Sequence, residues 1–202
     1  IVVVNPIFID KLVKYGIRRE KVKYIPNFVS KEEFYPEQQA EKNAFRNQLG
    51  IPLDKFVVFG DGQVQARKGV DDFAKMAEAN PEIQFIWAGG FSFGKITDGY
   101  DHFKELVDNP PQNLTFTGII DRQKLVDYLN IADLFVLPSF DELFPMSVLE
   151  AFSCGTPVLL RDLDLYKAII DGYYMKGENF EEMNEQLRRV AYDKTMLNKY
   201  AN

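Results

Sequence analysis

Short apolar runs alternate with amphipathic stretches along most of the chain. The apolar runs include FVVFG at 56–60, IQFIWA at 83–88 and LFVL at 134–137, each too short for a buried helix. In the stretches between them, apolar residues recur every three or four positions, which is typical of helices that cover a sheet. This alternation predicts an α/β fold with a Rossmann-like, doubly wound parallel sheet.

The element boundaries follow from the same pattern. The predicted strands are 1–4, 22–26, 56–60, 83–88, 114–117, 134–137 and 157–160. The predicted helices are 6–15, about 40–49, 70–79, 122–131 and 146–153, and a polar helical region follows at 179–200. Asn5 and Asp121 are expected to cap two of these helices, because their short side chains can accept hydrogen bonds from free helix N–H groups. Pro6 suits a first helical turn.

The stretch PNFVSKEEFYP at 26–36 differs from its surroundings. Two prolines bracket charged residues, and no helical or strand period is visible, which predicts a crossover between domains. We therefore expect residues 1–36 to be a remnant of an N-terminal domain with the crossover, and 37–202 to be a C-terminal domain. The opening IVVVNP is already a strand running into a helix start, so a preceding segment is expected.

Composition and charge narrow the function. With 46% hydrophobic residues in 202, the chain can bury a core. Lys and Arg total 24 against 30 for Asp and Glu, which argues against a nucleic-acid partner and a polybasic membrane patch. A single cysteine, Cys154, excludes an internal disulfide and fits a reducing cytoplasm. No apolar run approaches the roughly 18 residues of a spanning helix.

The stretch FGDGQVQARKGVDDF at 59–73 leads from a strand through glycines to two cations and a helix. Gly62 allows the backbone to approach a ligand, and Arg67 and Lys68 stand beside the free N–H groups of the helix, so phosphate is the ligand that suits. Gln65 replaces the third glycine of the dinucleotide fingerprint, and no Walker loop is present, so neither hydride transfer nor ATP hydrolysis is indicated. A glycine turn with two solvated cations stays open as the alternative.

Two glutamates flank the apolar run in DELFPMSVLEAFSCGTPVLL at 141–160. Glu142 follows a predicted strand at its carboxyl end, where open α/β sheets bind ligands. Glu150 lies about two turns into the next helix, on a face that can point toward the same crevice. Carboxylates accept hydrogen bonds from hydroxyls, and a nucleotide sugar offers hydroxyls on ribose and hexose. The alternative is a solvated loop glutamate and an exposed helix acid.

Five sequence motifs occur in a recognisable order. They are the glycine turn with Lys-Gly at 62–69, WAGG at 87–90, FTG at 116–118, ADLFVLPS at 132–139, and Glu142 and Glu150 with seven residues between them. In this order they resemble the family-four retaining glycosyltransferases of the GT-B fold, over residues 20 to about 175. YIPNFVSKEEFYP resembles the crossover between the two Rossmann-like domains of those enzymes.

The resemblance implies a role for each matching position. Glu150 would bind the ribose hydroxyls of the donor, Glu142 would lie close to the transferred sugar, and Lys68 would hold the diphosphate during its departure. The backbone would approach the sugar and the diphosphate through N–H groups at a helix start, over Leu143, Phe144, Pro145, Met146 and Ser147. The backbone at Ile119 would meet the base. The resemblance is to a metal-independent fold without a cofactor, so the Asp-x-Asp triplet at 162–164 is expected to be a loop.

This sequence departs from the family pattern at a few positions. Gln63 stands where the family commonly has arginine, and Arg67 is the candidate that replaces this cation. Leu143 replaces a frequent glycine, and Lys167 lies near a frequent glutamate. GQVQARKG, GGFSFG and RDLDLY resemble the branch that glycosylates diacylglycerol lipids in Gram-positive bacteria.

These observations predict the donor-binding domain of a retaining glycosyltransferase that moves a hexose from UDP-glucose or UDP-galactose to an acceptor hydroxyl. The acceptor, with a diacylglycerol glycolipid as the candidate, would bind mainly to the N-terminal domain, so this chain would bind the donor without turnover. The full-length protein is expected in the cytoplasm, with peripheral contact at the inner face of the membrane. Two alternatives stay open: a non-catalytic nucleotide-sugar-binding module, supported by Gln63 and Lys167, and an unrelated phosphate-ester enzyme on a doubly wound sheet.

Overall fold

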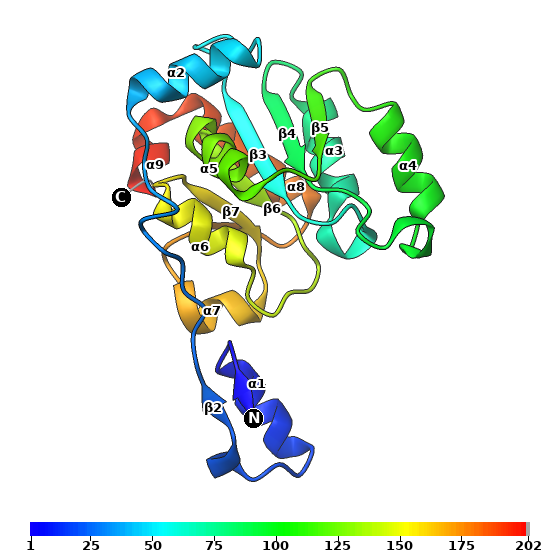
Figure 1. The fold of residues 1–202 in the computed structure, drawn as a ribbon, viewed down its shortest axis with the longest axis vertical. Helices are drawn as coiled ribbons and strands as arrows, with labels where there is room; N and C mark the ends of the chain where they lie inside the picture. The colour runs from blue at the N-terminus through cyan, green and yellow to red at the C-terminus, as the bar shows by residue number, and fades with distance from the viewer. Residues whose placement is uncertain (201–202) are drawn as a thin grey trace.

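The computed structural model describes residues 1–200, which form a small N-terminal unit and a large α/β unit (Figure 1). The N-terminal unit contains β1 (Val2–Val3), α1 (Ile7–Lys14), the short 3-10 helix η1 (Arg19–Lys21) and β2 (Lys23–Tyr24). Its two strands pair in parallel, and an extended linker leads from it to the large unit. None of the helices within residues 1–200 is long and apolar enough to cross a membrane.

The large unit is built on six parallel strands in the order β5-β4-β3-β6-β7-β8. Their bounds are β3 (Val57–Asp61), β4 (Gln84–Ala88), β5 (Leu114–Gly118), β6 (Leu134–Leu137), β7 (Val158–Arg161) and β8 (Met175–Gly177). The chain winds outward from β3 to one edge and then returns to β6 at the centre. Because the winding direction reverses between β3 and β6, the loops at their carboxyl ends diverge and leave a crevice.

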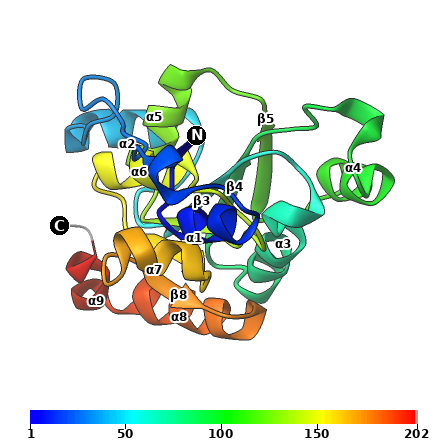
Figure 2. The same cartoon turned by 90° about the horizontal axis from the view of Figure 1, so that it is seen from below.

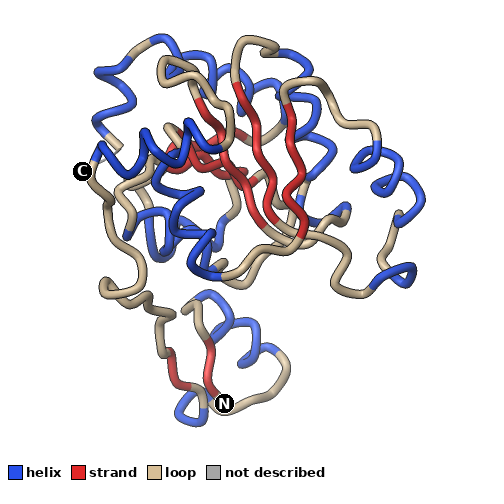
Figure 3. Tube along the Cα trace, turned by 45° about the horizontal axis from the view of Figure 1, so that its top comes forward, coloured by secondary structure: helices blue, strands red, loops and turns tan. Residues whose placement is uncertain are grey.

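Helices cover both faces of this sheet (Figures 1 and 2). One face carries α2 (Gln39–Gln48), α5 (Arg122–Ile131) and α6 (Met146–Ser153), and the other carries α3 (Val70–Ala79) and α8 (Phe180–Tyr192). The remaining helices are α4 (Tyr100–Asp108), α7 (Asp164–Ile170), α9 (Lys194–Lys199) and the 3-10 helices η2 (Ala66–Lys68) and η3 (Gly94–Ile96). Figure 3 shows the strands between these helices, with the N-terminal unit apart from the sheet.

The core lies between the sheet and its two helix layers. Every residue of β6 and β7 is buried, as expected for parallel strands that are covered on both faces. Met183, Leu187 and Val190 form a buried stripe on α8, at the spacing of one helix face. The ring of Phe73 packs edge-on against Trp87 at 5.0 Å, which joins α3 to the sheet.

The sequence predicted most of these elements. Three predicted helices, 70–79, 122–131 and 146–153, agree with α3, α5 and α6 at both ends. The prediction gives no bounds for α4, α7 and β8, and within the predicted helical region 179–200 the structure has two helices, α8 and α9, which Asp193 separates.

The sequence predicted N-terminal caps for two helices, α1 and α5. The expected cap of α5 is confirmed, because Asp121 accepts a hydrogen bond from the Lys124 N–H at 2.8 Å. The expected cap of α1 is confirmed as well, because the Asn5 Oδ1 accepts a hydrogen bond from the Ile7 N–H at 3.1 Å and Pro6 has the backbone angles of a first helical turn.

Candidate active site

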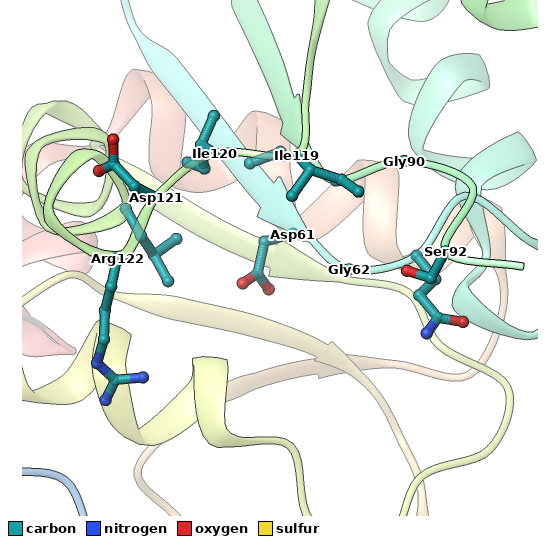
Figure 4. A pocket seen from close by; sticks show the side chains of 12 residues that line it. Asp61, Gly62, Gly90, Ser92, Ile119, Ile120, Asp121 and Arg122 are labelled. Carbon is teal, nitrogen blue, oxygen red and sulfur yellow. The ribbon is translucent and has the colours of Figure 1, made fainter.

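A pocket of about 340 Å³ opens at the carboxyl edge of the sheet (Figure 4). The loops after β3, β4 and β5 line it together with the start of α5, and the predicted residues Gly62, Gln63 and Ile119 are among its walls. Gly89 has a φ of +132°, and a Cβ there would lie 1.9 Å from the Gly62 carbonyl oxygen. Only glycine therefore allows the two loops to meet, and both glycines line the pocket.

An ion pair joins the two loops at the centre of the sheet. The Lys68 Nζ lies 2.6 Å from the Glu142 Oε1, although the two residues are 74 positions apart. Their side chains are only 12% and 7% exposed, so the two charges neutralise each other away from bulk water. The structure thus brings together the cation and the first carboxylate that the sequence predicts.

Arg67 adds a second cation at the same place. Its guanidinium donates to the Asp141 carbonyl oxygen at 2.6 Å and lies 3.5 Å from the Glu142 Oε2. The Arg67 carbonyl oxygen accepts in turn from the Phe140 N–H, so the loops after β3 and β6 are bonded at several points. Two cations therefore face one buried carboxylate.

Gly69 fixes the position of these cations. It has a φ of +70° between η2 and α3, and a Cβ there would lie 2.2 Å from the Pro138 carbonyl oxygen. The tight turn brings Lys68 beneath the first glycine of the motif, since a Cβ on Gly62 would lie 3.2 Å from the Lys68 Cε.

The start of α6 is open toward the crevice. Pro145 precedes the helix in an extended conformation, and no side chain caps the N–H groups of its first turn. Ser147 and Glu150 are three residues apart on this helix, so they share a face, and both are buried. An uncapped helix start beside two cations is an environment that attracts an anion.

The loop before α6 divides its residues between core and crevice. Leu143 is 65% exposed, whereas Phe144 is buried and packs edge-on against the Tyr166 ring at 6.2 Å. The amide of Asn27 donates to the Phe144 carbonyl oxygen at 3.1 Å, and the amide of Asn5 donates to the Leu143 carbonyl oxygen at 3.4 Å. The side chain of Phe144 therefore belongs to the core, and only its backbone is available to a ligand.

Glu150 is the most buried carboxylate of the crevice, with 5% of its side chain exposed. Burial, and then the negative charge of Asp61, raises the pKa of Glu150 to about 7, while the Arg122 guanidinium opposes the shift. The Arg122 Nη1 lies 3.4 Å from the Glu150 Oε1, and its Nε lies 2.9 Å from the Glu33 Oε2. An arginine on α5 thus connects the linker to the second predicted carboxylate.

Asp61 ends β3 inside the same pocket (Figure 4). Burial raises the pKa of its carboxyl to about 6, whereas a hydrogen bond with Ser147 and the charge of Lys68 lower it, and Glu142 raises it. The crevice therefore gathers hydroxyl acceptors and local cations, which suits a ligand that carries both hydroxyls and phosphate.

The sequence missed Asp61 and Arg122. For Asp61 a signal existed, because a polar residue directly after a buried strand lies at the ligand edge of a parallel sheet. For Arg122 there was none, since its partner Glu33 is 89 residues away.

The structure also describes the surroundings of the Asp-x-Asp triplet at 162–164 and of Cys154. The side chain of Asp162 is ion-paired with Lys167 at 3.5 Å and with Lys176 at 3.4 Å. The expectation of a loop at 162–164 is wrong at its last residue, because α7 begins at Asp164. Burial raises the pKa of the Cys154 thiol to about 12, so this cysteine is unreactive. Within residues 1–200, no three His, Cys, Asp or Glu side chains come together to hold a metal ion.

The fold and crevice define a doubly wound domain with a binding site at its switch point. Residues 41–202 match the family described as glycosyl transferases group 1, and the chain belongs to this family. It is 55% identical over 197 residues to the alpha-galactosylglucosyldiacylglycerol synthase of Streptococcus pneumoniae, covering 98% of this chain and 53% of that protein. It is 30% identical over 162 residues to the processive diacylglycerol alpha-glucosyltransferase of Acholeplasma laidlawii, covering 79% and 48%. The chain thus spans about half the length of these relatives.

Solved structures share the fold. HepE of Anabaena, in a complex with UDP and glucose, superposes with a TM-score of 0.86 at 18% identity, covering 100% of this chain and 55% of that one. Sucrose-phosphate synthase of Thermosynechococcus elongatus gives a TM-score of 0.84 at 23% identity, covering 100% and 51%. The predicted family-four resemblance and the Rossmann-like fold class are both confirmed.

Proposed function

We propose that this chain is the donor-binding domain of a retaining glycosyltransferase that transfers a hexose from UDP-glucose or UDP-galactose to an acceptor hydroxyl. The observation that carries the proposal is the buried pair of Lys68 and Glu142, 2.6 Å apart, beside the uncapped start of α6. Such a junction offers a cation and free N–H groups to a diphosphate, and a carboxylate to a sugar hydroxyl. Membership of the glycosyltransferase family supports this assignment.

In this proposal the base, ribose, diphosphate and hexose of the donor lie one after another along the crevice. The base enters the pocket between the backbone at Ile119 and the loop of Gly62 and Gln63, and the ribose reaches Glu150. The diphosphate follows at the start of α6, where Lys68, Arg67 and the N–H groups between Leu143 and Ser147 hold it. Exposed residues near Leu143 then face the hexose. This order agrees with the burial of Glu150, because a carboxylate deep in the crevice needs hydroxyl partners.

The same contacts accelerate the reaction. Negative charge grows on the diphosphate as the sugar departs, so a fixed cation and helix N–H groups stabilise the transition state more than the ground state. In the free chain Glu142 holds Lys68. A bound diphosphate competes for this ammonium, which leaves the Glu142 carboxylate free to accept hydrogen bonds from the hexose.

The acceptor is a diacylglycerol-linked glycolipid, and the full-length protein is cytoplasmic with peripheral contact at the inner face of the membrane. The name of the Streptococcus pneumoniae relative supports this, since it names a glycosylated diacylglycerol. Residues 1–36 are the end of the acceptor-binding domain and the crossover, and 37–202 are the donor domain. The sheet topology supports this division, because β1 and β2 pair with each other and are not part of the six-stranded sheet.

The experiment is a transfer assay with the full-length protein that contains this chain. UDP-glucose and UDP-galactose are supplied with glucosyldiacylglycerol in vesicles, and the anomeric configuration of the product is read by NMR. We expect an α-linked product, loss of transfer on Lys68→Ala, and unchanged transfer on Lys104→Ala, an exposed control on α4. Binding of the donor without transfer to any acceptor would favour the non-catalytic module. Lys167, one of the departures that support that module, forms ion pairs with Asp162 and Asp164.

A further inference from the structure

The proposed roles leave Asp61 unused, although it occupies the middle of the site. It is the last residue of β3, and Figure 4 shows its carboxyl group pointing into the pocket between Gly62 and Arg122. A carboxylate at this place is costly to bury unless something accepts or satisfies its charge. Its position therefore calls for a ligand group that carries hydrogen-bond donors.

The surroundings of Asp61 come from four elements. Ser147 on α6 hydrogen-bonds to its side chain, Lys68 supplies a nearby positive charge, and Glu142 a negative one. Ser147 and Glu150 lie on one face of α6, and the Asp61 carboxyl group is close enough for its charge to raise the pKa of Glu150, so both carboxyl groups belong to the same part of the crevice. Arg122 on α5 contacts Glu150 through its Nη1, and its Nε forms an ion pair with Glu33 of the linker.

Two neighbouring carboxyl groups discriminate between the parts of a nucleotide. A diphosphate carries only acceptors and negative charge at neutral pH, so it is repelled where two carboxylates converge. A ribose carries two neighbouring hydroxyls, each of which donates one hydrogen bond, and two carboxylates can accept both. The cations around these carboxyl groups already have partners, because Lys68 is paired with Glu142 and Arg122 contacts both Glu150 and Glu33.

We propose that Asp61 binds the ribose together with Glu150, one vicinal hydroxyl to each carboxylate, and that it is a determinant of specificity for ribonucleotides. This inference rests on the proposed nucleotide-sugar site and adds a residue to it. Ser147, at the start of α6, orients the Asp61 carboxylate. The groups that bind the ribose therefore lie next to the helix start that binds the diphosphate.

The test compares UDP with 2′-deoxy-UDP and 3′-deoxy-UDP by calorimetric titration of the 202-residue chain. We expect each missing hydroxyl to weaken binding by about tenfold or more in the parent. Asp61→Ala should lose about tenfold for UDP and lose the preference for one hydroxyl, while Glu150→Ala should lose the preference for the other. Asp61→Asn, which keeps the size of the side chain, should retain an intermediate preference. Asp101→Ala, an exposed control on α4, should bind like the parent.

The outcomes separate the two proposals. Equal losses for UDP and both deoxy analogues in Asp61→Ala and Asp61→Asn would give this residue a structural role only. A gain in UDP affinity would mean that Asp61 repels the diphosphate, which also overturns the inference. If the parent chain bound none of the nucleotides, the donor site itself would fail. Circular dichroism of each variant shows whether a loss reflects misfolding, and Asp61→Asn decides the question if Asp61→Ala does not fold.

Discussion

Glu150 should lower the stability of the free protein at neutral and higher pH. Its pKa rises from about 4.5 to about 7 on folding, so the folded state holds the proton more tightly than the unfolded state. Raising the pH through this interval therefore removes stability, with no penalty below about 4.5 and the full penalty above about 7. At about 1.4 kcal/mol per pKa unit, the ceiling is about 3 kcal/mol, and the burial of the side chain means that solvent screening reduces it little.

Glu150→Gln removes the charge and keeps the shape, so it should stabilise the chain by about 1–3 kcal/mol at about pH 8 and by less than half of that gain at about pH 5.5. Urea unfolding followed through the fluorescence of Trp87, which is fully buried and the single tryptophan, measures the difference. Glu185→Gln, an exposed glutamate on α8, is the matched control and should change nothing at either pH. Equal stability of Glu150→Gln and the parent at about pH 8, or the same gain at both values, would refute the reasoning.

Three further variants test separate parts of the account. Glu142→Ala should leave UDP affinity nearly unchanged and weaken UDP-glucose, because this carboxylate is assigned to the hexose; equal losses in calorimetry would contradict that division. Gly69→Ala should destabilise the chain by several kcal/mol in urea unfolding, since its Cβ would lie 2.2 Å from the Pro138 carbonyl oxygen, and a loss below about 1 kcal/mol would show that the turn relaxes. Arg67→Ala should weaken UDP binding if this guanidinium replaces the cation that is absent at Gln63, and an unchanged dissociation constant would leave it as a surface residue.

The sequence predicted the elements that carry a strong apolar period. The helix at 70–79 shows this, because five of its residues are buried and mark one face. By contrast, α4 buries only Phe103, and β8 has three residues, so neither leaves a readable pattern. Periodicity reports how much of an element faces the core, and these two elements face it little.

The sequence predicted those site residues that match a motif position. It did not predict which of these residues contact one another. Lys68 and Glu142 were both named, but their ion pair depends on β3 and β6 being neighbours, which strand order alone determines. The core role of the Phe144 side chain depends on Tyr166, which the motif does not include. Asp61 was not predicted as a site residue, because the first motif of the resemblance begins one residue later, at Gly62.

The central claim is that the junction of Lys68 with α6 binds a diphosphate. The most direct measurement is the calorimetric titration of UDP and uridine into this chain and its Lys68→Ala variant, at low and at high salt. The account predicts that Lys68→Ala weakens UDP far more than uridine, and that this difference shrinks as salt screens the charge. If Lys68→Ala bound UDP as tightly as the parent at low salt, the glycine turn would be only a turn, and the proposed donor site would be wrong.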